Sequence, residues 1–445
     1  MKATRGWQRP IKDIFLMSSS RQRSRLKRPL WIIVLVTFVI IFLITAFIYP
    51  PTTSTACYIF SSRDCTLFNQ PSVFAARELS DEETRSHVVI REILKTPPIQ
   101  SKNPKIAFLF LTTGMLHFEP LWDKFFSVRV CSLIIIIGIN YATSHMQILI
   151  NIFLQGHEDR FSVYVHTSRE KPVHTSRYFI GRDIHGETVL KRKEGKKKKK
   201  LLKDGRCLLR SRLMQVVWGK IPMIDIERRL LAHSLLDPDN QQFVLLSDSC
   251  IPLHNFDYVY NYLMLTNVSF IDCFVDHGPH GTGRYSERMR PEVEKNAFQK
   301  GSQWFTMKRQ HAIIVMADNL YYRKFKNYCK PNMDGRNCYA DEHYLPTLFN
   351  MIDPDGIANR SVTYVDWSAG KWHPRAFRAR DVTFEFLKNL TFIEEGIHFT
   401  SDRKRRVRGS CFWNSMKRPC YLFARKFYPE TLHKLMIHFS NYTTI

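Results

Sequence analysis

The sequence predicts an α/β fold with a mixed, largely parallel sheet, preceded by one transmembrane helix. Short apolar runs that end in polar residues alternate with helical patterns along most of the chain, and a single long uncharged run stands near the N-terminus. The chain has 445 residues with a hydrophobic content of 44%, which is enough for a large packed core.

The N-terminal run predicts a membrane anchor. Residues 30–49, LWIIVLVTFVIIFLITAFIY, carry no charge and have the length of a helix that spans a bilayer. Basic residues crowd residues 21–28, so we expect residues 1–29 to be a cytosolic basic tail. A cleaved signal peptide fits less well, because the run is too long and lies far from the start. We expect a lumenal stem at residues 50–103 and a folded lumenal domain at residues 104–445.

A lumenal domain agrees with the cysteines and with the glycosylation sequons. An oxidising compartment makes disulfides among the ten cysteines the expected outcome. The pairs that lie close in sequence are Cys57 with Cys65, Cys329 with Cys338, and Cys411 with Cys420. The candidate N-glycosylation sites are Asn267, Asn359, Asn389 and Asn441.

Strands and helices follow one another in an alternating order. The predicted elements are a strand at 105–114, a helix through 121–126, strands at 160–168 and 216–220, a helix from Pro222, and strands at 241–253 and 268–274. Such an order is typical of a parallel sheet with helices on its faces. Ligands of these sheets bind beyond the carboxyl ends of the strands, where Ser247, Asp248 and Ser249 would lie.

Two segments interrupt this order. Residues 127–155 are apolar but broken by polar residues, and residues 188–215 contain a run of lysines. The first could be a second membrane span, and the second a solvated loop or a polyanion site. We interpret both as insertions translated from retained introns. Each has an unusual composition and ends in Gln, as a CAG acceptor site would encode.

The net charge of +26 does not predict a nucleic-acid partner. Three blocks, residues 1–28, 188–215 and 402–426, contain the whole excess of Lys and Arg over Asp and Glu. The rest of the chain is close to neutral, whereas a nucleic-acid binder carries a basic face on its folded domain. We therefore expect no nucleic acid among its partners.

Several ordered sequence blocks resemble a known family. With residues 127–155 and 188–215 set aside, the chain contains LWDKFF–GHEDRFSVYVHTS, FVLLSDSCIPL, KGSQWFTMKR, YADEHYLPT and CYLFARKFYPE. These blocks are similar to the plant branch of the Core-2/I-branching β-1,6-N-acetylglucosaminyltransferase-like family, which includes the brittle-culm type of Golgi proteins. The resemblance implies a GT-A-like fold and a type II Golgi membrane protein. It also implies inverting transfer of a sugar, GlcNAc-like or related, from a UDP-sugar to a cell-wall or glycoprotein glycan.

The stretch YADEHYLPT carries the candidate catalytic residues. An inverting transferase needs a carboxylate that accepts the proton of the attacking hydroxyl. The resemblance implies that this base is Glu342, and Asp341 would orient the site or cap the following helix. His343 is expected to pack in the core or to support the residues of the site from behind, rather than to be a ligand. The alternative is that both acids only favour a helix N-terminus.

Candidate donor-binding residues lie in two places. After the buried strand a single carboxylate, Asp248, is available, which is a poor platform for a divalent metal. The resemblance implies a metal-independent site in which basic residues hold the diphosphate, so we expect no cofactor and no bound metal. Lys426 matches the family's diphosphate-binding lysine, Arg425 is adjacent to it, and Arg403 falls at the family's arginine spacing. A solvated basic face is the alternative for this cluster.

Two Asp-x-Asp strings offer a different kind of donor site. Residues 237–239 and 353–355 are both Asp-Pro-Asp, and proline within each string predicts a turn rather than a metal platform.

The acceptor-binding candidates are Trp304, Trp367, Lys308 and Arg284. The tryptophans could stack on sugar faces, and the basic residues could contact glycan hydroxyls or acidic groups. Arg284 belongs to a Gly-rich loop, HGPHGTGRYSER, that could form a rim over the substrate. Burial in the core is the alternative for both tryptophans.

Two other functions remain open from the sequence. The chain could be a non-catalytic, membrane-anchored glycan-binding or scaffold protein on the same fold, which translated insertions would favour. It could also be a metal-dependent transferase that uses Asp248.

Overall fold

The computed structural model describes most of the predicted lumenal domain and little of the N-terminus. The described residues are 35–39, 79–97, 101–127, 157–169, 171–184, 222–371, 373–401, 405–413 and 416–443. The chain divides into two compact units, residues 1–75 and 76–445. Of the predicted anchor, only residues 35–39 are described, and they are helical. Within the described residues, no helix has the length and apolar character needed to cross a bilayer.

A four-stranded sheet forms the centre of the second unit. Its strands are β1 (Lys105–Thr112), β2 (Phe161–Thr167), β3 (Asn240–Ser247) and β5 (Thr306–Lys308), in the order β2-β1-β3-β5. The first three are parallel, and β5 is antiparallel to β3. The apolar run KIAFLFLT of β1 is buried on both faces, as expected for a central parallel strand. The predicted mixed, largely parallel sheet is confirmed.

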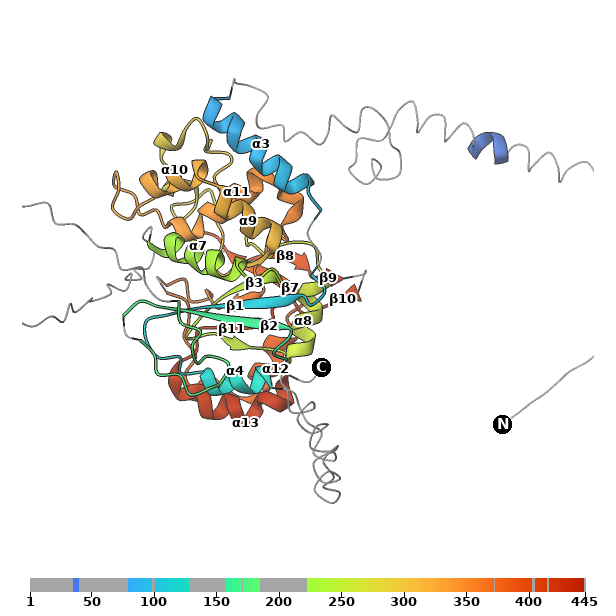
Figure 1. Ribbon diagram of the computed structural model, residues 1–445, viewed down its shortest axis with the longest axis vertical. Coiled ribbons are helices and arrows are strands. Elements are labelled where there is room, and N and C mark those ends of the chain that lie inside the picture. The colour runs from blue at the N-terminus through green and yellow to red at the C-terminus, as the bar shows by residue number, and fades with distance from the viewer. Residues whose placement is uncertain are drawn as a thin grey trace, which may run out of the picture. The chain divides into compact units, whose positions relative to one another are not determined.

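Helices cover both faces of this sheet (Figure 1). On one side lie α4 (Glu119–Phe126), α8 (Phe256–Met264), α12 (Phe384–Thr391) and α13 (Leu432–Tyr442). On the other lie α7 (Pro222–Leu235), α9 (Arg309–Ala317), α10 (Leu320–Tyr328) and α11 (Tyr344–Ile352). Successive residues of β1 enter opposite cores: Phe108 packs edge-on against Phe125 and Phe126 of α4, whereas Leu109 packs with the α7 side.

The predicted stem contributes a helix to the folded domain. α3 (Asp81–Lys95) begins at a capping box formed by Ser80 and Glu83, and it packs against α9 and α10. The side chain of Gln310 donates to the carbonyl of Ile93 at 2.9 Å. The folded domain therefore begins before residue 104, because the apolar face of α3 is buried against these helices.

A second sheet departs from the prediction for residues 241–253. The chain turns after Ser247, where the amide of Cys250 donates to the carbonyl of Ser247. The following residues form β4 (Ile251–Pro252) in a separate sheet with β11 (Phe423–Arg425) and β6 (Thr363–Val365), in the order β4-β11-β6. The prediction of one continuous strand was wrong, because the first part of this apolar run pairs in the central sheet and the last part pairs in the second sheet.

The strand predicted at residues 268–274 was also wrong. Ser269, Phe270 and Phe274 make isolated bridges to Ile357, Thr306 and Lys300, without a continuous ladder. The edge of the central sheet next to β3 is occupied instead by β5, whose residues gave no clear strand signal.

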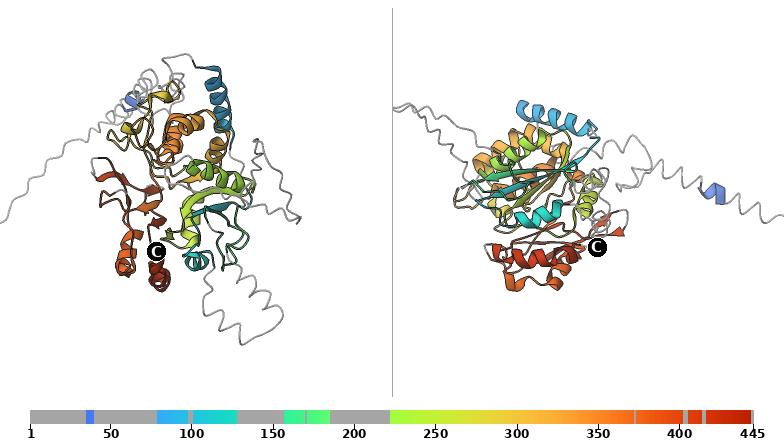
Figure 2. Two further views of the ribbon diagram at one scale, coloured as in Figure 1. Left: turned by 90° about the vertical axis from the view of Figure 1, so that its left-hand side faces the viewer. Right: turned by 60° about the horizontal axis from the view of Figure 1, so that its bottom comes forward.

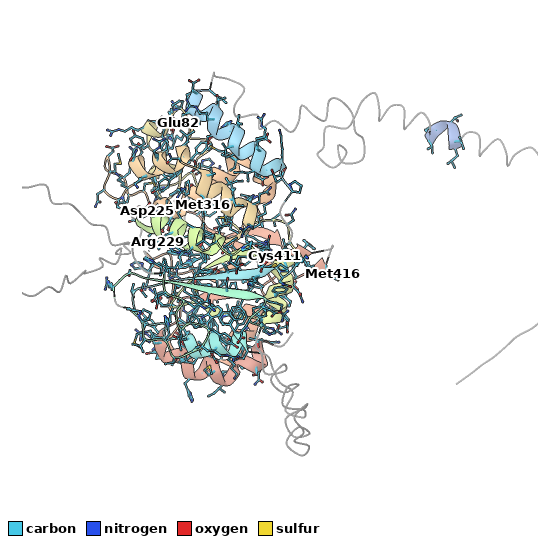
Figure 3. The ribbon with its side chains drawn as sticks, in the orientation of Figure 1. Glu82, Asp225, Arg229, Met316, Cys411 and Met416 are labelled. Atoms are coloured by element: carbon cyan, nitrogen blue, oxygen red, sulfur yellow. A yellow bond between two sulfur atoms is a disulfide. The ribbon has the colours of Figure 1, made fainter. Side chains whose placement is uncertain are left out.

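Two predicted disulfides are confirmed. Cys329–Cys338 and Cys411–Cys420 are both bonded, each with a sequence separation of 9. The second lies beside the hairpin of β9 (Phe412–Trp413) and β10 (Met416–Lys417), where Figure 3 labels Cys411 and Met416. The preceding hairpin is β7 (Glu395–Phe399) with β8 (Arg405–Ser410). Cys57 and Cys65 lie outside the described residues.

The two predicted insertions lie outside the described residues, except for Ser127, and so does the strand predicted at 216–220. The residues on either side of the first insertion are in direct contact. The amide of His157 donates to the carbonyl of Phe126 at 3.2 Å. The chain therefore leaves and re-enters the core at one point.

Candidate active site

A Gly-rich loop positions one wall of the site. It runs from residue 277 to residue 288 and contains the short 3-10 helix η2 (Thr282–Arg284). A side chain at Gly281 would place its Cβ 1.9 Å from the carbonyl oxygen of Asp276, so the loop can close only around glycine. Asp276 also accepts hydrogen bonds from Ser401, which ties the loop to the end of the β7 segment. The loop turns the side chain of Arg284 inward.

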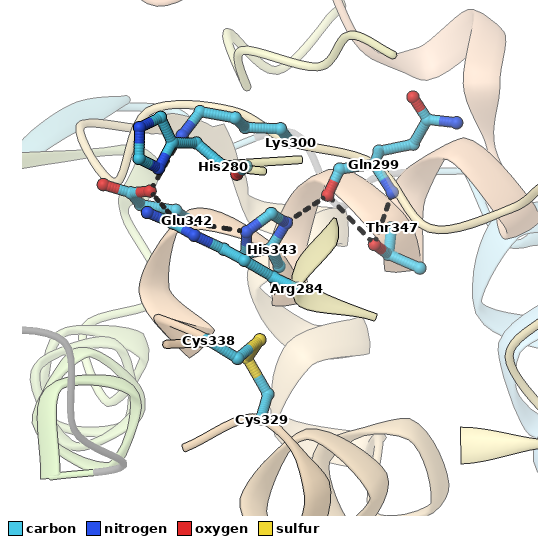
Figure 4. Close-up of a disulfide and its surroundings, with 9 residues drawn as sticks. All are labelled: His280, Arg284, Gln299, Lys300, Cys329, Cys338, Glu342, His343 and Thr347. Carbon is cyan, nitrogen blue, oxygen red and sulfur yellow. Dashed lines mark hydrogen bonds and ion pairs between the residues drawn. A yellow bond between two sulfur atoms is a disulfide. The ribbon is translucent and has the colours of Figure 1, made fainter. Parts of the chain in front are cut away.

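Glu342 lies where this loop meets the 3-10 helix η4 (Ala340–Glu342), as Figure 4 shows. Its Oε2 accepts from Arg284 Nη1 at 2.5 Å and from Lys300 Nζ at 3.1 Å. The Glu342 side chain is 28% exposed, so the carboxylate is open to a ligand. Burial alone would raise its pKa, but the positive charges of Lys300 and Arg284 outweigh burial and lower the pKa to about 2. The carboxylate is therefore ionised at physiological pH.

The neighbours of Glu342 serve different purposes. His343 is buried, its Nδ1 lies 2.7 Å from the carbonyl of Gln299, and its ring stacks on Phe298. Burial lowers the pKa of His343 to about 3, so the imidazole is neutral and acts in packing, as predicted. Asp341 is buried and does not cap α11, because the N-terminus of that helix has no side-chain hydrogen bond.

A second cluster occupies the carboxyl ends of the strands. Asp248 follows β3 and accepts a hydrogen bond from the Thr112 hydroxyl, at the end of β1, at 3.4 Å. The amide of Phe427 donates to the carbonyl of Ser249 at 3.1 Å, which brings the end of β11 to the same edge. Arg425 and Lys426 therefore lie beside Asp248, and we call Asp248, Arg425 and Lys426 the cationic edge.

The electrostatics of the cationic edge differ from those of Glu342. Burial raises the pKa of Asp248, and the charges of Arg425 and Lys426 only partly oppose this. Burial lowers the pKa of Lys426, and the neighbouring Arg425 lowers it further. The edge thus holds two cations, a buried Arg425 and a half-buried Lys426, beside one carboxyl group whose pKa burial raises. It is suited to bind an anion.

Residues 301–304 connect the two clusters. The amide of Gly301 donates to the carbonyl of Glu342 at 2.9 Å, and the guanidinium of Arg425 lies 3.9 Å from the ring centre of Trp304. Three extended residues span at most about 10 Å. The backbone contact of Glu342 and the residue that supports the cationic edge are therefore joined by a segment no longer than about 10 Å.

The structure separates the predicted acceptor residues. Trp304 is 3% exposed and lies under Arg425, so its ring supports the cationic edge and is not open for sugar stacking. Trp367 is half-buried and follows β6, whose last residue pairs with Arg425. Arg284 contacts Glu342 directly. Lys308 pairs with Gln242 at the opposite end of β3 and donates to the carbonyl of Asn267.

Other predicted residues lie away from the two clusters or are not described. Arg403 is outside the described residues. Of the two Asp-x-Asp strings, residues 237–239 form a turn, as predicted, in which the amide of Asp239 donates to the Asp237 side chain. Asp353 instead precedes a short 3-10 helix, η5 (Pro354–Gly356), and its carboxylate lies 2.8 Å from His311. Of the sequon residues, Asn267, Asn389 and Asn441 are exposed and Asn359 is half-buried. In the described part of the chain, no three His, Cys, Asp or Glu side chains gather closely enough to hold a metal ion.

Two contributors to the clusters were missed from the sequence. Lys300 stands in the block KGSQWFTMKR, but its contact with Glu342 depends on the turn at Gly301. There a Cβ would come within 1.8 Å of the Asp272 carbonyl oxygen. Thr112 ends a buried strand and carries no motif. Its position at the carboxyl end of β1, where the strands' ligands bind, was the available signal.

Comparison with known proteins identifies the family. The profile of the Core-2/I-branching enzyme family matches residues 137–391. The chain belongs to this family. It is also 31% identical over 370 residues to "Glycosyltransferase BC10" of Oryza sativa subsp. japonica, covering 76% of this chain and 77% of the relative. The resemblance noted in the sequence is thus confirmed, and the mixed sheet fits a glycosyltransferase fold.

Membership makes the chain a glycosyltransferase of the Core-2/I-branching family, which implies a nucleotide-sugar donor and a glycan acceptor. The matched residues include Asp248, Arg284 and Glu342. They end before Arg425 and Lys426.

Proposed function

We propose that this member of the family transfers a sugar from a UDP-sugar to a glycan or glycoprotein acceptor with inversion at the anomeric carbon. The sugar is GlcNAc or a related one. The observation that carries the proposal is an ionised, partly exposed Glu342 that residues 301–304 connect to the cationic edge. A donor whose diphosphate lies on that edge would place its anomeric carbon near the Glu342 carboxylate.

In this reaction Glu342 acts as the general base. The acceptor oxygen attacks the anomeric carbon while Glu342 takes its proton, and the bond from that carbon to the phosphate oxygen breaks. Arg284 and Lys300 keep the carboxylate ionised and hold it in place.

The leaving UDP requires positive charge near its diphosphate. Arg425 and Lys426 supply this charge from rigid positions at the end of β11, and we assign Arg403 to the same role from its sequence position. Fixed cations can stabilise the leaving group without a divalent metal, so we propose metal-independent transfer.

We also propose that the protein is a single-pass type II membrane protein of the Golgi, with its catalytic domain in the lumen. The uncharged run at residues 30–49, the basic residues before it and the two disulfides support this topology.

A calorimetric titration of the purified protein with UDP, with and without EDTA, tests the donor site. We expect binding that is unchanged by the chelator. A screen of UDP-sugars for hydrolysis then identifies the donor. A protein that binds no UDP would contradict the proposal and favour the scaffold alternative, and turnover that requires manganese would favour the metal-dependent one.

A further inference from the structure

Two buried carboxyl groups lie behind Glu342 and have no role in the reaction as described. Asp341, on η4, is 6% exposed, and Glu227, on α7, is 3% exposed. Within the described residues, Asp341 Oδ1 and Glu227 Oε1 have no hydrogen-bond partner. α7 packs directly against η4, so the two side chains share one pocket. Buried carboxyl oxygens without partners are costly when charged, because nothing replaces their hydration.

The pocket favours the neutral form of both groups. Burial raises the pKa of Glu227 well above its usual value, and the charge of Asp341 adds to this effect. Burial also raises the pKa of Asp341 to about 7, and the adjacent charge of Glu342 contributes. Both shifts favour the neutral acid, and Asp341, with a pKa of about 7, titrates near neutral pH.

Arg284 and Lys300 connect Asp341 to the site. Both contact Glu342, and both also act on Asp341, whose ionised form they stabilise. A neutral Asp341 leaves the two cations to Glu342. An ionised Asp341 competes for them and repels the neighbouring carboxylate.

The other charged groups around the pocket do not compensate either acid. Arg228 of α7 donates to the carbonyls of Val315 and Asp318, and Asp225 contacts Lys326. The remaining titratable side chains of α7, α11 and η4 are those of Arg229, His233, Tyr344 and Glu342. The charge that acts on Glu227 is that of Asp341.

We propose that Asp341 is a positioning residue that works in its neutral form, in the pocket it shares with Glu227, and whose ionisation draws Arg284 and Lys300 away from Glu342. This inference rests on the proposed function, since Glu342 is the general base. It predicts that transfer is fastest below neutral pH and falls as Asp341 ionises.

The pH range 6–8 spans the pKa of Asp341. The pKa of Glu342 is about 2 and that of His343 about 3, and burial lowers the pKa of His280 from its ordinary value. A single group with a pKa of about 7 loses most of its protons between pH 6 and 8. For an enzyme active only in the protonated form, kcat should fall about tenfold over this range, with KM for the UDP-sugar unchanged.

The test compares Asp341→Asn and Glu227→Gln with the wild type in the full-length protein. The donor is UDP-N-acetylglucosamine, or whichever panel member is hydrolysed. Asp341→Asn should give a kcat that changes less than twofold from pH 6 to 8. Glu227→Gln leaves Asp341 and the charges of Glu342, Arg284 and Lys300 that act on it in place, so it should keep the wild-type fall. An Asp341→Asn profile that still falls tenfold would overturn the proposal, and so would a flat profile for Glu227→Gln.

Thermal unfolding tests the pair without substrate. The folded state binds the Asp341 proton more tightly than the unfolded chain, so rising pH between about 4 and 7 lowers wild-type stability through this group. The Tm of Asp341→Asn relative to wild type should therefore rise from pH 5 to pH 8. A pH-independent difference would overturn the proposal, even if no donor is ever found. If this Tm difference rises with pH as predicted but no donor is turned over, the proposed function is wrong and the protonation of Asp341 is as inferred.

Discussion

The Glu342 cluster and the cationic edge contain the same charges in different arrangements. Each has one carboxyl group and two cations. At Glu342 the cations touch the carboxylate at 2.5 and 3.1 Å, and its pKa falls to about 2. At the cationic edge, Asp248 accepts from Thr112 and Arg425 lies over Trp304, and the pKa of Asp248 rises through burial.

This difference distinguishes the Glu342 cluster, whose opposite charges pair with one another, from the cationic edge, which is suited to an anionic ligand. Direct contact uses the charges of Arg284 and Lys300 to hold Glu342 ionised. At the cationic edge, Arg425 and Lys426 lie beside one carboxyl group, Asp248, whose pKa burial raises, so the cluster has more cationic than anionic groups. A transferase needs both arrangements, one for the proton and one for the leaving group.

The largest effect is expected from Glu342→Gln. The amide keeps the shape and can accept a hydrogen bond but cannot take a proton, so kcat should fall by about 10²–10⁴-fold. Because the cationic edge is untouched, calorimetry should give a UDP affinity within about twofold of wild type. Unchanged turnover would show that another group is the base.

Lys426→Met should act on the other cluster. Losing one charge-assisted hydrogen bond to phosphate costs about 1.5–3 kcal/mol, so we expect the Kd for UDP to rise by roughly 10- to 100-fold. Lys124→Met, on the exposed surface of α4, is the matched control and should leave the Kd unchanged. Equal affinities for the two variants would remove Lys426 from the donor site.

Each of the two disulfides lies close in sequence to one of the two clusters. Each has a sequence separation of 9, so opening either should cost a similar free energy of unfolding, about 2–3 kcal/mol. Cys338 lies just before η4 and Cys420 shortly before β11. The Cys329→Ser/Cys338→Ser pair should therefore lower kcat more than UDP affinity, and Cys411→Ser/Cys420→Ser should do the reverse. Unfolding curves and kinetics of both double variants provide the measurement; identical kinetic defects would contradict the division.

The smallest effect is expected from deleting residues 127–155. Phe126 and His157 are already hydrogen-bonded across this segment, so joining Phe126 to Gly156 should preserve β1, β2 and both clusters. We expect UDP binding to be unchanged and Tm to be equal or slightly higher, since a shorter loop costs less entropy to close. Loss of folding would show that the segment belongs to the core. Transcript sequencing across both segments tests their intron origin directly.

The sequence predicted the parallel strands well and the site less completely. β1 is recognisable because a strand buried on both faces needs continuous apolar residues, and β2 because its residues alternate in character. The block YADEHYLPT and the family resemblance identified Glu342 as the candidate base. Lys308 and Trp304 show what a sequence block cannot predict. Both belong to the block KGSQWFTMKR, but Lys308 lies at the far end of β3 and Trp304 lies beneath Arg425.

The sequence by itself determined the alternating order of elements, the candidate disulfide pairs and the chemical types of residue available for transfer, because these depend on local pattern and composition. Only the tertiary structure decided that Arg284 and Lys300 meet at Glu342, that Glu227 lies behind Asp341, and that β4 leaves the central sheet. These contacts join residues far apart in the chain. Their charges and burial therefore depend on packing that no local pattern contains.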